Sequence, residues 1–221
     1  MRVYYFTDEK YAVENIKKRQ LKLSFFDLVN DVFELKPFDF GKRKIRHAWQ
    51  KRLNQAAKSQ GFVSFCESWS VPTMWAHYAN NHKGICYGFD LLGNEALKID
   101  YVKTLRPFDP LALSDPCVNK SEVNYASRTK SSHWEYEDEW RQYVSLTLKE
   151  IENKANGQKL FFVNFSERLV LKEVIIGSKS QITSKSIREA LLPTESVEIK
   201  TARPSFRNFK IVEQGHVKYQ K

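Results

Sequence analysis

Apolar and polar residues alternate along several short segments of the chain, which is the pattern of strands with one buried face. The segments RVYYFT at 2–7 and LKLSFF at 21–26 follow this pattern. Unbroken apolar runs predict further, more deeply buried strands, namely GFVSFC at 61–66, GICYGFD at 84–90, KLFFVNF at 159–165 and LVLKEVIIG at 169–177. Two short strands are expected to close the chain over 196–214.

Helical spacing of apolar residues marks a smaller number of segments. In 8–20, Asp8 suits the N-cap position, and Tyr11, Val13 and Ile16 are expected to face inward. In 41–60, one stripe runs through Ile45, Trp49, Leu53 and Ala56. Shorter helices are expected at 72–82, where Pro72 suits the first turn, and at 183–193.

The order of these elements predicts the fold class. Pro107, Pro110 and Pro116 indicate a loop or extended excursion over 106–120. Strands and helices do not alternate regularly, as they would in a doubly wound sheet. We therefore expect one α+β domain spanning 1–221, with split or mostly antiparallel sheets, few helices, and a basic helical insertion at about 41–60.

Net charge adds an expectation about partners. The chain carries a formal charge of +10, and residues 41–60 contain seven Lys or Arg and no Asp or Glu. Such a segment is typical of a surface that contacts nucleic acid or another acidic macromolecule, but a merely solvated helix face has the same composition. The predicted nucleic-acid contacts are Lys42, Arg43, Lys44, Arg46, Lys51 and Arg52.

Several classes of protein are disfavoured. No apolar run approaches the roughly 20 residues that span a bilayer, and the first residues lack a signal-peptide pattern, so a cytoplasmic protein without membrane contact is expected. The three cysteines lie far apart without a metal-binding spacing. No phosphate-binding loop, HExxH or GxSxG motif is present, and no cysteine has an activating neighbour in sequence, so neither a metal nor a cysteine nucleophile is expected.

Two stretches carry the candidate chemistry. The first, MWAHYANNHKGICYGFD at 74–90, brings Trp75, His77, Tyr78 and His82 together. It is either a hydrogen-bonded core network or one wall of a ligand site. The second, HWEYEDEWRQY at 133–143, is expected to be a strand, because its aromatic residues favour one.

On such a strand, alternate residues share a face. Glu135, Glu137, Glu139 and Arg141 would then line up on one side. Neighbouring carboxylates repel, so one of them is expected to have a raised pKa or a specific cationic partner. A salt-bridged strand edge is the simpler alternative.

These stretches also carry a resemblance. NDVFE at 30–34, FCES at 65–68, the 74–90 motif and WEYEDEWR at 134–141 resemble a bacterial family known as domain of unknown function 2971. The resemblance runs from the first strand to EVIIG at 173–177, and it departs from the family pattern at Val32, where proline is usual. That family label implies no activity.

A looser resemblance does imply one. The order VYYFT, EKYAVENIKKRQLKLS and EYEDEW is similar to that of ADP-ribosyltransferases, including DNA-modifying toxins of toxin–antitoxin systems. It implies NAD as co-substrate, a toxin or anti-phage role, a nucleic-acid or protein acceptor, and an antitoxin protein as a partner. Glu139 would be the essential carboxylate, with Glu137 as the alternative and Tyr78 beside them. The implied NAD contacts are Tyr5, Ser24, Trp75, His77, His82 and Arg141.

Two other functions remain open on sequence grounds. The basic helix and the aromatic cluster also suit a non-catalytic nucleic-acid or nucleotide-binding module. A metal-dependent nuclease built on the three glutamates ranks last, because no motif supplies its other ligands. Trp75 is also typical of an ordinary core residue.

Overall fold

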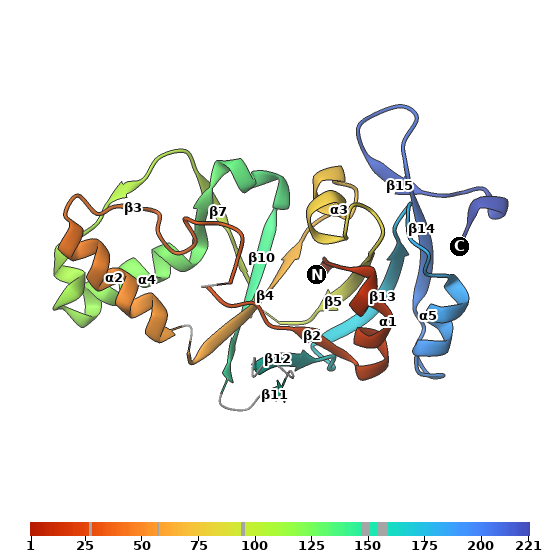
Figure 1. Cartoon of the computed structure of the whole chain (residues 1–221), viewed down its shortest axis with the longest axis horizontal. Coiled ribbons are helices and arrows are strands. Elements are labelled where there is room, and N and C mark those ends of the chain that lie inside the picture. Colours follow the sequence, from red (N-terminus) through yellow and green to blue (C-terminus); the bar gives the residue numbers. More distant parts are fainter. Residues whose placement is uncertain (27, 57, 94–95, 147–150, 154–158) are drawn as a thin grey trace.

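The centre of the molecule is a curled, eight-stranded sheet (Figure 1). The computed structural model describes residues 1–26, 28–56, 58–93, 96–146, 151–153 and 159–221. All neighbouring strands of the sheet are antiparallel except β13 and β14, which are parallel. The strands lie in the order β15 (Ile211–Glu213), β14 (Glu198–Pro204), β13 (Leu169–Ile176), β5 (Ile85–Leu91), β1 (Arg2–Thr7), β4 (Gln60–Cys66), β10 (Glu139–Ser145) and β6 (Ala96–Lys98).

One face of this sheet is covered by α1 (Glu9–Lys18) and α5 (Ser184–Ala190), which contact each other. Asp8 caps α1 as predicted, since its carboxylate accepts a hydrogen bond from the backbone N–H of Lys10 at 2.8 Å. The predicted inward face is partly wrong. Ile16 is buried and Tyr11 is exposed, because Ala12 rather than Tyr11 packs into the core.

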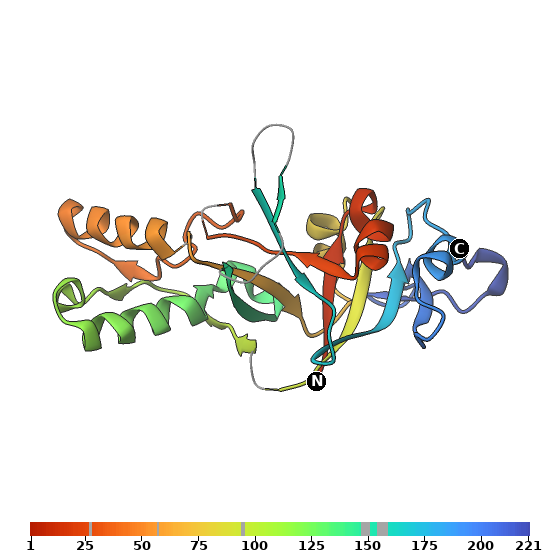
Figure 2. The same cartoon turned by 90° about the horizontal axis from the view of Figure 1, so that it is seen from below.

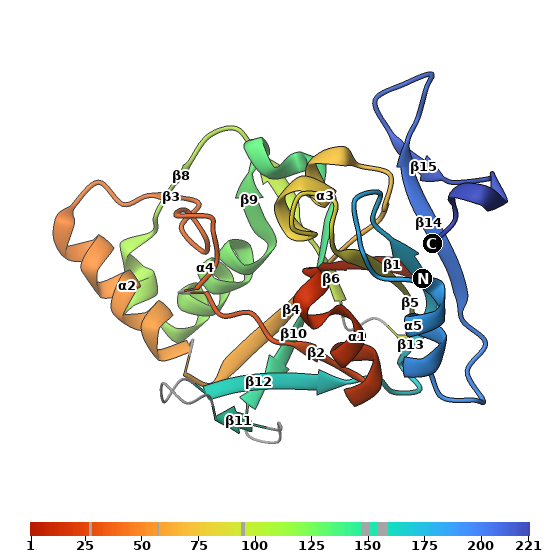
Figure 3. The ribbon, with the colours of Figure 1, turned by 45° about the vertical axis from the view of Figure 1, so that its right-hand side comes forward.

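A separate three-stranded sheet lies beside this core, in the order β11 (Ile151–Asn153), β12 (Lys159–Asn164) and β2 (Gln20–Lys22) (Figure 3). Beyond β2 the chain continues extended, and Ser24 pairs with Phe62 of β4 through two backbone hydrogen bonds of 2.8 and 3.0 Å. This pairing places Ser24 beside the middle of the main sheet.

The opposite face of the main sheet is covered by α3 (Pro72–Tyr78), which begins at Pro72 as predicted. Trp75 is completely buried against Phe6 of β1, and its ring nitrogen donates to the carbonyl of Trp69 at 2.6 Å. The core reading of Trp75 is therefore the one that the structure supports. Tyr78 is the last residue of α3 and is half-buried.

A helical lobe projects from one end of the sheet, where α2 (Arg43–Ala56) lies beside α4 (Pro116–Arg128) (Figure 2). Its own aromatic core contains Phe38, Trp49 and Phe108, with ring centroids 5.2–5.4 Å apart. The predicted stripe of α2 is confirmed at Trp49 and Leu53, which are buried. Two short strands complete the lobe, β3 (Phe38–Asp39) and β8 (Arg106–Pro107), which pair in parallel.

The loop predicted over 106–120 is wrong. A 3₁₀ helix, η1 (Pro110–Leu113), and most of the first half of α4 occupy it. Asp109 and Asp115 cap these two helices, and a proline follows each cap. Proline has no N–H to satisfy at the first helical position, so these prolines favour helix starts rather than a loop.

The described residues contain no helix with the length and apolarity required to cross a bilayer. The remaining elements are β7 (Asp100–Val102), β9 (Thr129–Ser131), η2 (Ser132–Glu137) and η4 (Val217–Tyr219). Strands β7 and β9 pair in parallel beside the start of β10. The structure is thus a single α+β domain with a mostly antiparallel main sheet, as predicted.

Candidate functional site

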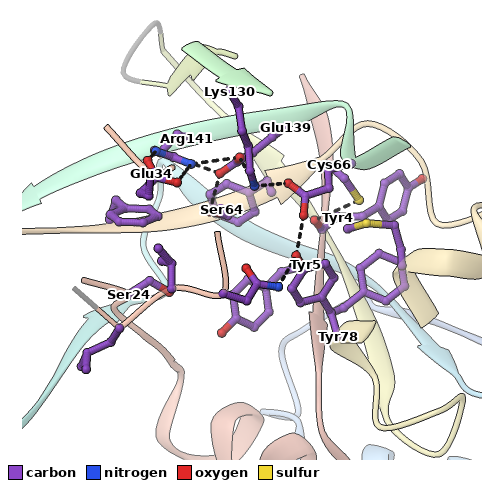
Figure 4. A pocket seen from close by; sticks show the side chains of 18 residues that line it. Tyr4, Tyr5, Ser24, Glu34, Ser64, Cys66, Tyr78, Lys130, Glu139 and Arg141 are labelled. Carbon is purple, nitrogen blue, oxygen red and sulfur yellow. Dashed lines mark hydrogen bonds and ion pairs between the residues drawn. The ribbon is translucent and has the colours of Figure 1, made fainter. Parts of the chain in front are cut away.

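A cleft of about 350 Å³ opens between β1, β4, β10 and α3 (Figure 4). Six residues predicted from sequence line it together: Tyr5, Ser24, Tyr78, Glu137, Glu139 and Arg141. They come from five different parts of the chain. The pairing of β1 with β4, and of β4 with β10, brings these parts together.

Glu139 is the first residue of β10, and its carboxylate is buried among donors. Arg141 donates to both of its oxygens, from Nε at 2.9 Å and from Nη2 at 3.0 Å. The hydroxyl of Ser64 on β4 donates to Oε1 at 2.5 Å. The backbone N–H of Glu139 donates to the hydroxyl of Tyr101 on β7 at 2.8 Å. Hydrogen bonds with Arg141, Ser64 and Tyr101 therefore hold Glu139 in place.

Arg141 bridges Glu139 to a second carboxylate, that of Glu34. Its Nη1 and Nη2 lie 2.6 and 3.2 Å from the two oxygens of Glu34. The guanidinium also lies over the ring of Phe62, 4.4 Å from its centroid. Glu34 reaches this position because Asp31 accepts the backbone N–H of Phe33 and so closes a turn. Bonds of this kind, from an aspartate side chain to a backbone N–H two residues on, are typical of turns.

Glu137 is the carboxylate closest to α3. Its Oε1 accepts the hydroxyl of Tyr78, and its Oε2 accepts the ammonium of Lys130. The side-chain amide of Asn30 donates to the Tyr78 oxygen at 3.2 Å. Lys130 also lies 3.4 Å from Glu139 and 4.8 Å from the centre of the Trp134 ring. Lys130 thus joins the two carboxylates into one network.

The charges of this network do not cancel. Three carboxylates, from Glu34, Glu137 and Glu139, meet two cations, Lys130 and Arg141, which leaves one formal negative charge. Burial raises the pKa of Glu137, and the nearby charge of Glu139 adds to the effect. Burial also opposes the charge of Glu139, but Arg141 and Lys130 outweigh it and lower its pKa. The pKa values of the two carboxylates are therefore shifted in opposite directions, and Glu137 binds a proton more readily than Glu139.

The strand predicted across 133–143 is only half correct. Residues 132–137 form the 3₁₀ helix η2, and the strand begins at Glu139. Between them Asp138 adopts a left-handed conformation with φ of 44°, which turns the chain between the two buried glutamates. Glu135 is exposed, so the predicted row of three carboxylates on one face is wrong. The third carboxylate of the cluster is Glu34 instead.

Three of the predicted NAD contacts lie outside this cleft. Trp75 belongs to the core, as described above. His82 stacks on the far side of Trp75, with ring centroids 6.3 Å apart, and occupies a turn with φ of 70°. His77 is exposed and lines a neighbouring cavity instead.

Three members of the network are not marked by the sequence as site residues: Glu34, Ser64 and Lys130. Glu34 closes the NDVFE motif, and Ser64 is the one polar side chain inside GFVSFC, so each carries a weak signal. Lys130 carries none, because nothing near it in sequence marks it as buried. Within the described ranges, no group of His, Cys, Asp and Glu is arranged to hold a metal ion.

The basic segment at α2 presents most of its predicted contacts to solvent. These are Lys42, which directly precedes the helix, and Arg43, Lys44, Arg46 and Lys51. Arg52 differs from them. Its guanidinium donates to the carbonyls of Ala112 and Leu113 at 2.9 and 2.7 Å. Arg52 therefore holds α2 against η1, and the other five residues form an exposed basic face.

In comparisons with known proteins, no family model, curated protein or solved structure matches the chain. The two resemblances drawn from sequence motifs therefore stay predictions.

Proposed function

We propose that this chain is an ADP-ribosyltransferase-like enzyme that acts on NAD. The observation that carries the proposal is Glu137, a buried carboxylate with a raised pKa at the wall of a tyrosine-lined cleft. Perturbed carboxylates in clefts are typical of active sites. The resemblance to ADP-ribosyltransferases supplies the reaction, and a nucleic acid or a protein is the acceptor that it implies.

The cleft suits one half of a dinucleotide. Its volume of about 350 Å³ lies at the small end of the range for ligand cavities. Tyr4 and Tyr5 of β1 and Tyr78 of α3 line it, and such rings suit an aromatic amide. Ser24 and Asn30 add polar groups at the same cleft. These residues are the ones that would hold the nicotinamide and its ribose.

Glu137 is suited to the chemistry. When the nicotinamide–ribose bond of NAD breaks, nicotinamide leaves with the bonding electrons and positive charge develops on the ribose carbon. An ionised Glu137 stabilises that charge, an effect that is strongest in the transition state. Its raised pKa then favours uptake of the proton that the attacking acceptor group releases. Tyr78 and Lys130 orient the carboxylate throughout.

Glu139 is the poorer candidate for this role, although the sequence favours it. Ser64 and Arg141 already donate three hydrogen bonds to its carboxylate, and Lys130 lies beside it. A ribose hydroxyl would have to displace one of these donors. We assign Glu139 the role of a positioning residue, which holds Lys130 and thereby Glu137.

The exposed face of α2 supports a nucleic-acid acceptor over a protein one. Lys44 and Arg46 lie on a helix without acidic residues, in the lobe that projects from one end of the sheet. Cations on such a surface contact phosphates without reading sequence. The resemblance also implies a toxin or anti-phage effector in the cytoplasm, controlled by an antitoxin protein.

One observation favours a second candidate, a non-catalytic nucleotide-binding module. Each carboxylate of the network is already paired to Lys130 or Arg141 within the chain. A saturated network of this kind is also what a purely structural ion cluster shows.

A single experiment separates the two candidates. Purified protein is incubated with NAD and a single-stranded oligonucleotide, and released nicotinamide is quantified by mass spectrometry. The enzyme proposal predicts release that is catalytic in protein. A module predicts bound, intact NAD or no binding, and either result contradicts the proposal.

A further inference from the structure

The hairpin that joins β14 to β15 projects from the end of the molecule opposite the helical lobe (Figure 1). At its base Ile211 is buried in the core, and its backbone N–H donates to the carbonyl of Ser70 at 2.9 Å. Residues 203–210 form the hairpin tip. There the N–H of Ser205 donates to the carbonyl of Lys210 at 2.9 Å, and the N–H of Arg207 donates to the Ser205 hydroxyl at 3.1 Å. Hydrogen bonds therefore hold the hairpin at both ends.

Two phenylalanine rings of the hairpin tip face solvent. Phe206 is 91% exposed and Phe209 is fully exposed. Single apolar residues scattered over a surface are common, but these two lie three residues apart on one projecting turn. A ring as exposed as Phe209 removes no apolar surface from water when the chain folds, so stability does not account for it. An exposed apolar pair of this kind is typical of a surface that docks on another body.

Cations accompany these rings. The segment RPSFRNFK at 203–210 contains Arg203, Arg207 and Lys210 and no acidic residue. The guanidinium of Arg203 lies over the Phe206 ring, 4.7 Å from its centroid. Arg207 and Lys210 are exposed on the turn itself. The hairpin tip therefore presents apolar rings and positive charge together, which an apolar layer with a negatively charged surface complements.

We propose that the hairpin tip is a membrane-surface anchor that docks on a bilayer containing anionic phospholipid. The two rings enter the boundary between headgroups and acyl chains, and the cations stay at the level of the headgroup phosphates. The convex shape of the tip favours a bilayer over other acidic partners. A protein would have to offer a matching pocket, and unpaired bases stack on rings that line a sheet face or a groove. A fluid bilayer takes up a convex tip without either.

The sequence-based expectation of no membrane contact rests on the lack of an apolar run of about 20 residues. A surface anchor needs no such run, because only a few of its side chains enter the bilayer. One short apolar segment binds weakly and reversibly, so attraction to anionic lipid is required as a second contribution. The anchor does not depend on the proposed activity on NAD, since no residue of the hairpin tip lines the cleft.

Co-sedimentation with sucrose-loaded vesicles tests the anchor without NAD. Vesicles of phosphatidylcholine alone are compared with vesicles of equal parts phosphatidylcholine and phosphatidylserine. Wild type is expected to prefer the mixed vesicles. Phe206→Ser with Phe209→Ser is expected to lower the affinity for them about 100-fold, at about 10-fold for each ring. Arg207→Gln with Lys210→Gln is expected to lower it about 25-fold, at about 5-fold for each cation.

Matched controls lie elsewhere on the chain. Phe33→Ser removes another exposed phenylalanine, and Lys185→Gln with Arg188→Gln removes the same charge from α5. Both controls should keep most of the wild-type affinity for the mixed vesicles, and circular dichroism confirms that each variant folds. Phe209→Trp measures depth, because lipids brominated on their acyl chains should quench the fluorescence that this variant adds to that of wild type.

Several results would overturn the anchor. These are no binding of wild type to mixed vesicles, equal binding by wild type and the double phenylalanine variant, an equal loss in the matched controls, and no quenching in Phe209→Trp. If wild type ignores vesicles and the double phenylalanine variant instead loses binding to a single-stranded oligonucleotide, the hairpin tip contacts nucleic acid and the proposal is wrong. Nicotinamide release is measured separately, so its failure leaves the anchor standing.

Discussion

Replacing Glu139 by glutamine tests whether this carboxylate is a structural anchor. The side chain of Glu139 is 3% exposed and receives two N–H donors of Arg141 and the hydroxyl of Ser64. Glutamine keeps one acceptor oxygen but turns an NH₂ group towards a cation.

The loss of stability expected for Glu139→Gln depends on which carboxylate partners Arg141 and Lys130 keep. Removing one partner of a buried ion pair costs about 3–5 kcal/mol. Arg141 keeps Glu34 and Lys130 keeps Glu137, so we expect the lower end, about 3 kcal/mol. For a domain of this length that corresponds to a fall of about 6–12 °C in the thermal midpoint.

Glu137→Gln is expected to behave differently. Its pKa is raised, which means that folding disfavours its charged form, so a neutral isostere removes a penalty as well as a contact. We expect a cost below about 1 kcal/mol. Glu135→Gln is the matched control, because Glu135 is exposed on the same segment, and it should change stability by less than about 0.5 kcal/mol.

Thermal unfolding followed by circular dichroism at pH 7, with urea unfolding as a second measure, decides between these outcomes. The reasoning is wrong if Glu137→Gln lowers the midpoint as much as Glu139→Gln. It is also wrong if Glu139→Gln costs no more than Glu135→Gln.

Three further predictions concern pH, charge and the helical lobe. The pKa of Glu137 is raised above 4.5, so ionisation of this group should reduce wild-type stability as pH rises through its folded pKa. Glu137→Gln should lack this loss when the thermal midpoints at pH 5 and pH 8 are compared. Lys44→Gln with Arg46→Gln should weaken oligonucleotide binding and reduce the slope of log affinity against log salt by about 1–2. Arg52→Met should lower stability by about 1–3 kcal/mol, because two carbonyls lose a charged donor, and should leave the salt slope nearly unchanged.

Each of these three predictions has a control variant or a result that would contradict it. Lys185→Gln with Arg188→Gln removes the same charge from α5, where both residues are exposed. An equal loss of binding in that pair would show that net charge, not the face of α2, governs binding. A flat difference between wild type and Glu137→Gln across pH would contradict the raised pKa. An Arg52→Met variant as stable as wild type would remove its structural role.

Local rules predicted much of the fold. Strands β1, β4, β5 and β13 lie where the pattern of apolar residues predicts them, because such a pattern is recognised from neighbouring residues alone. The Asp8 cap and the burial of Trp49 on α2 follow from spacing in the same way. Helix α4 is not predicted, because Pro110 and Pro116 are also typical of loops; the aspartate that precedes each of them is the signal that favours a helix start.

The site was predictable only in part, because its charges come together through long-range pairing. Glu137 and Glu139 stand out within an aromatic segment, but their partners Glu34 and Lys130 lie on other elements. The burial of Lys130 depends on the parallel pairing of β7 with β9, which leaves no periodic signal in a three-residue strand. The division of roles between the two glutamates likewise required the position of Arg141.

The central claim is that Glu137 is the carboxylate that acts on the NAD ribose, and its most direct test is the rate of nicotinamide release by Glu137→Gln beside wild type and Glu135→Gln. The account predicts that Glu137→Gln stays folded and loses about 10²- to 10³-fold in rate, which is the usual effect of removing one group that stabilises transition-state charge. It predicts that Glu135→Gln retains the wild-type rate. Wild-type turnover by folded Glu137→Gln, or no release by wild type itself, would contradict it.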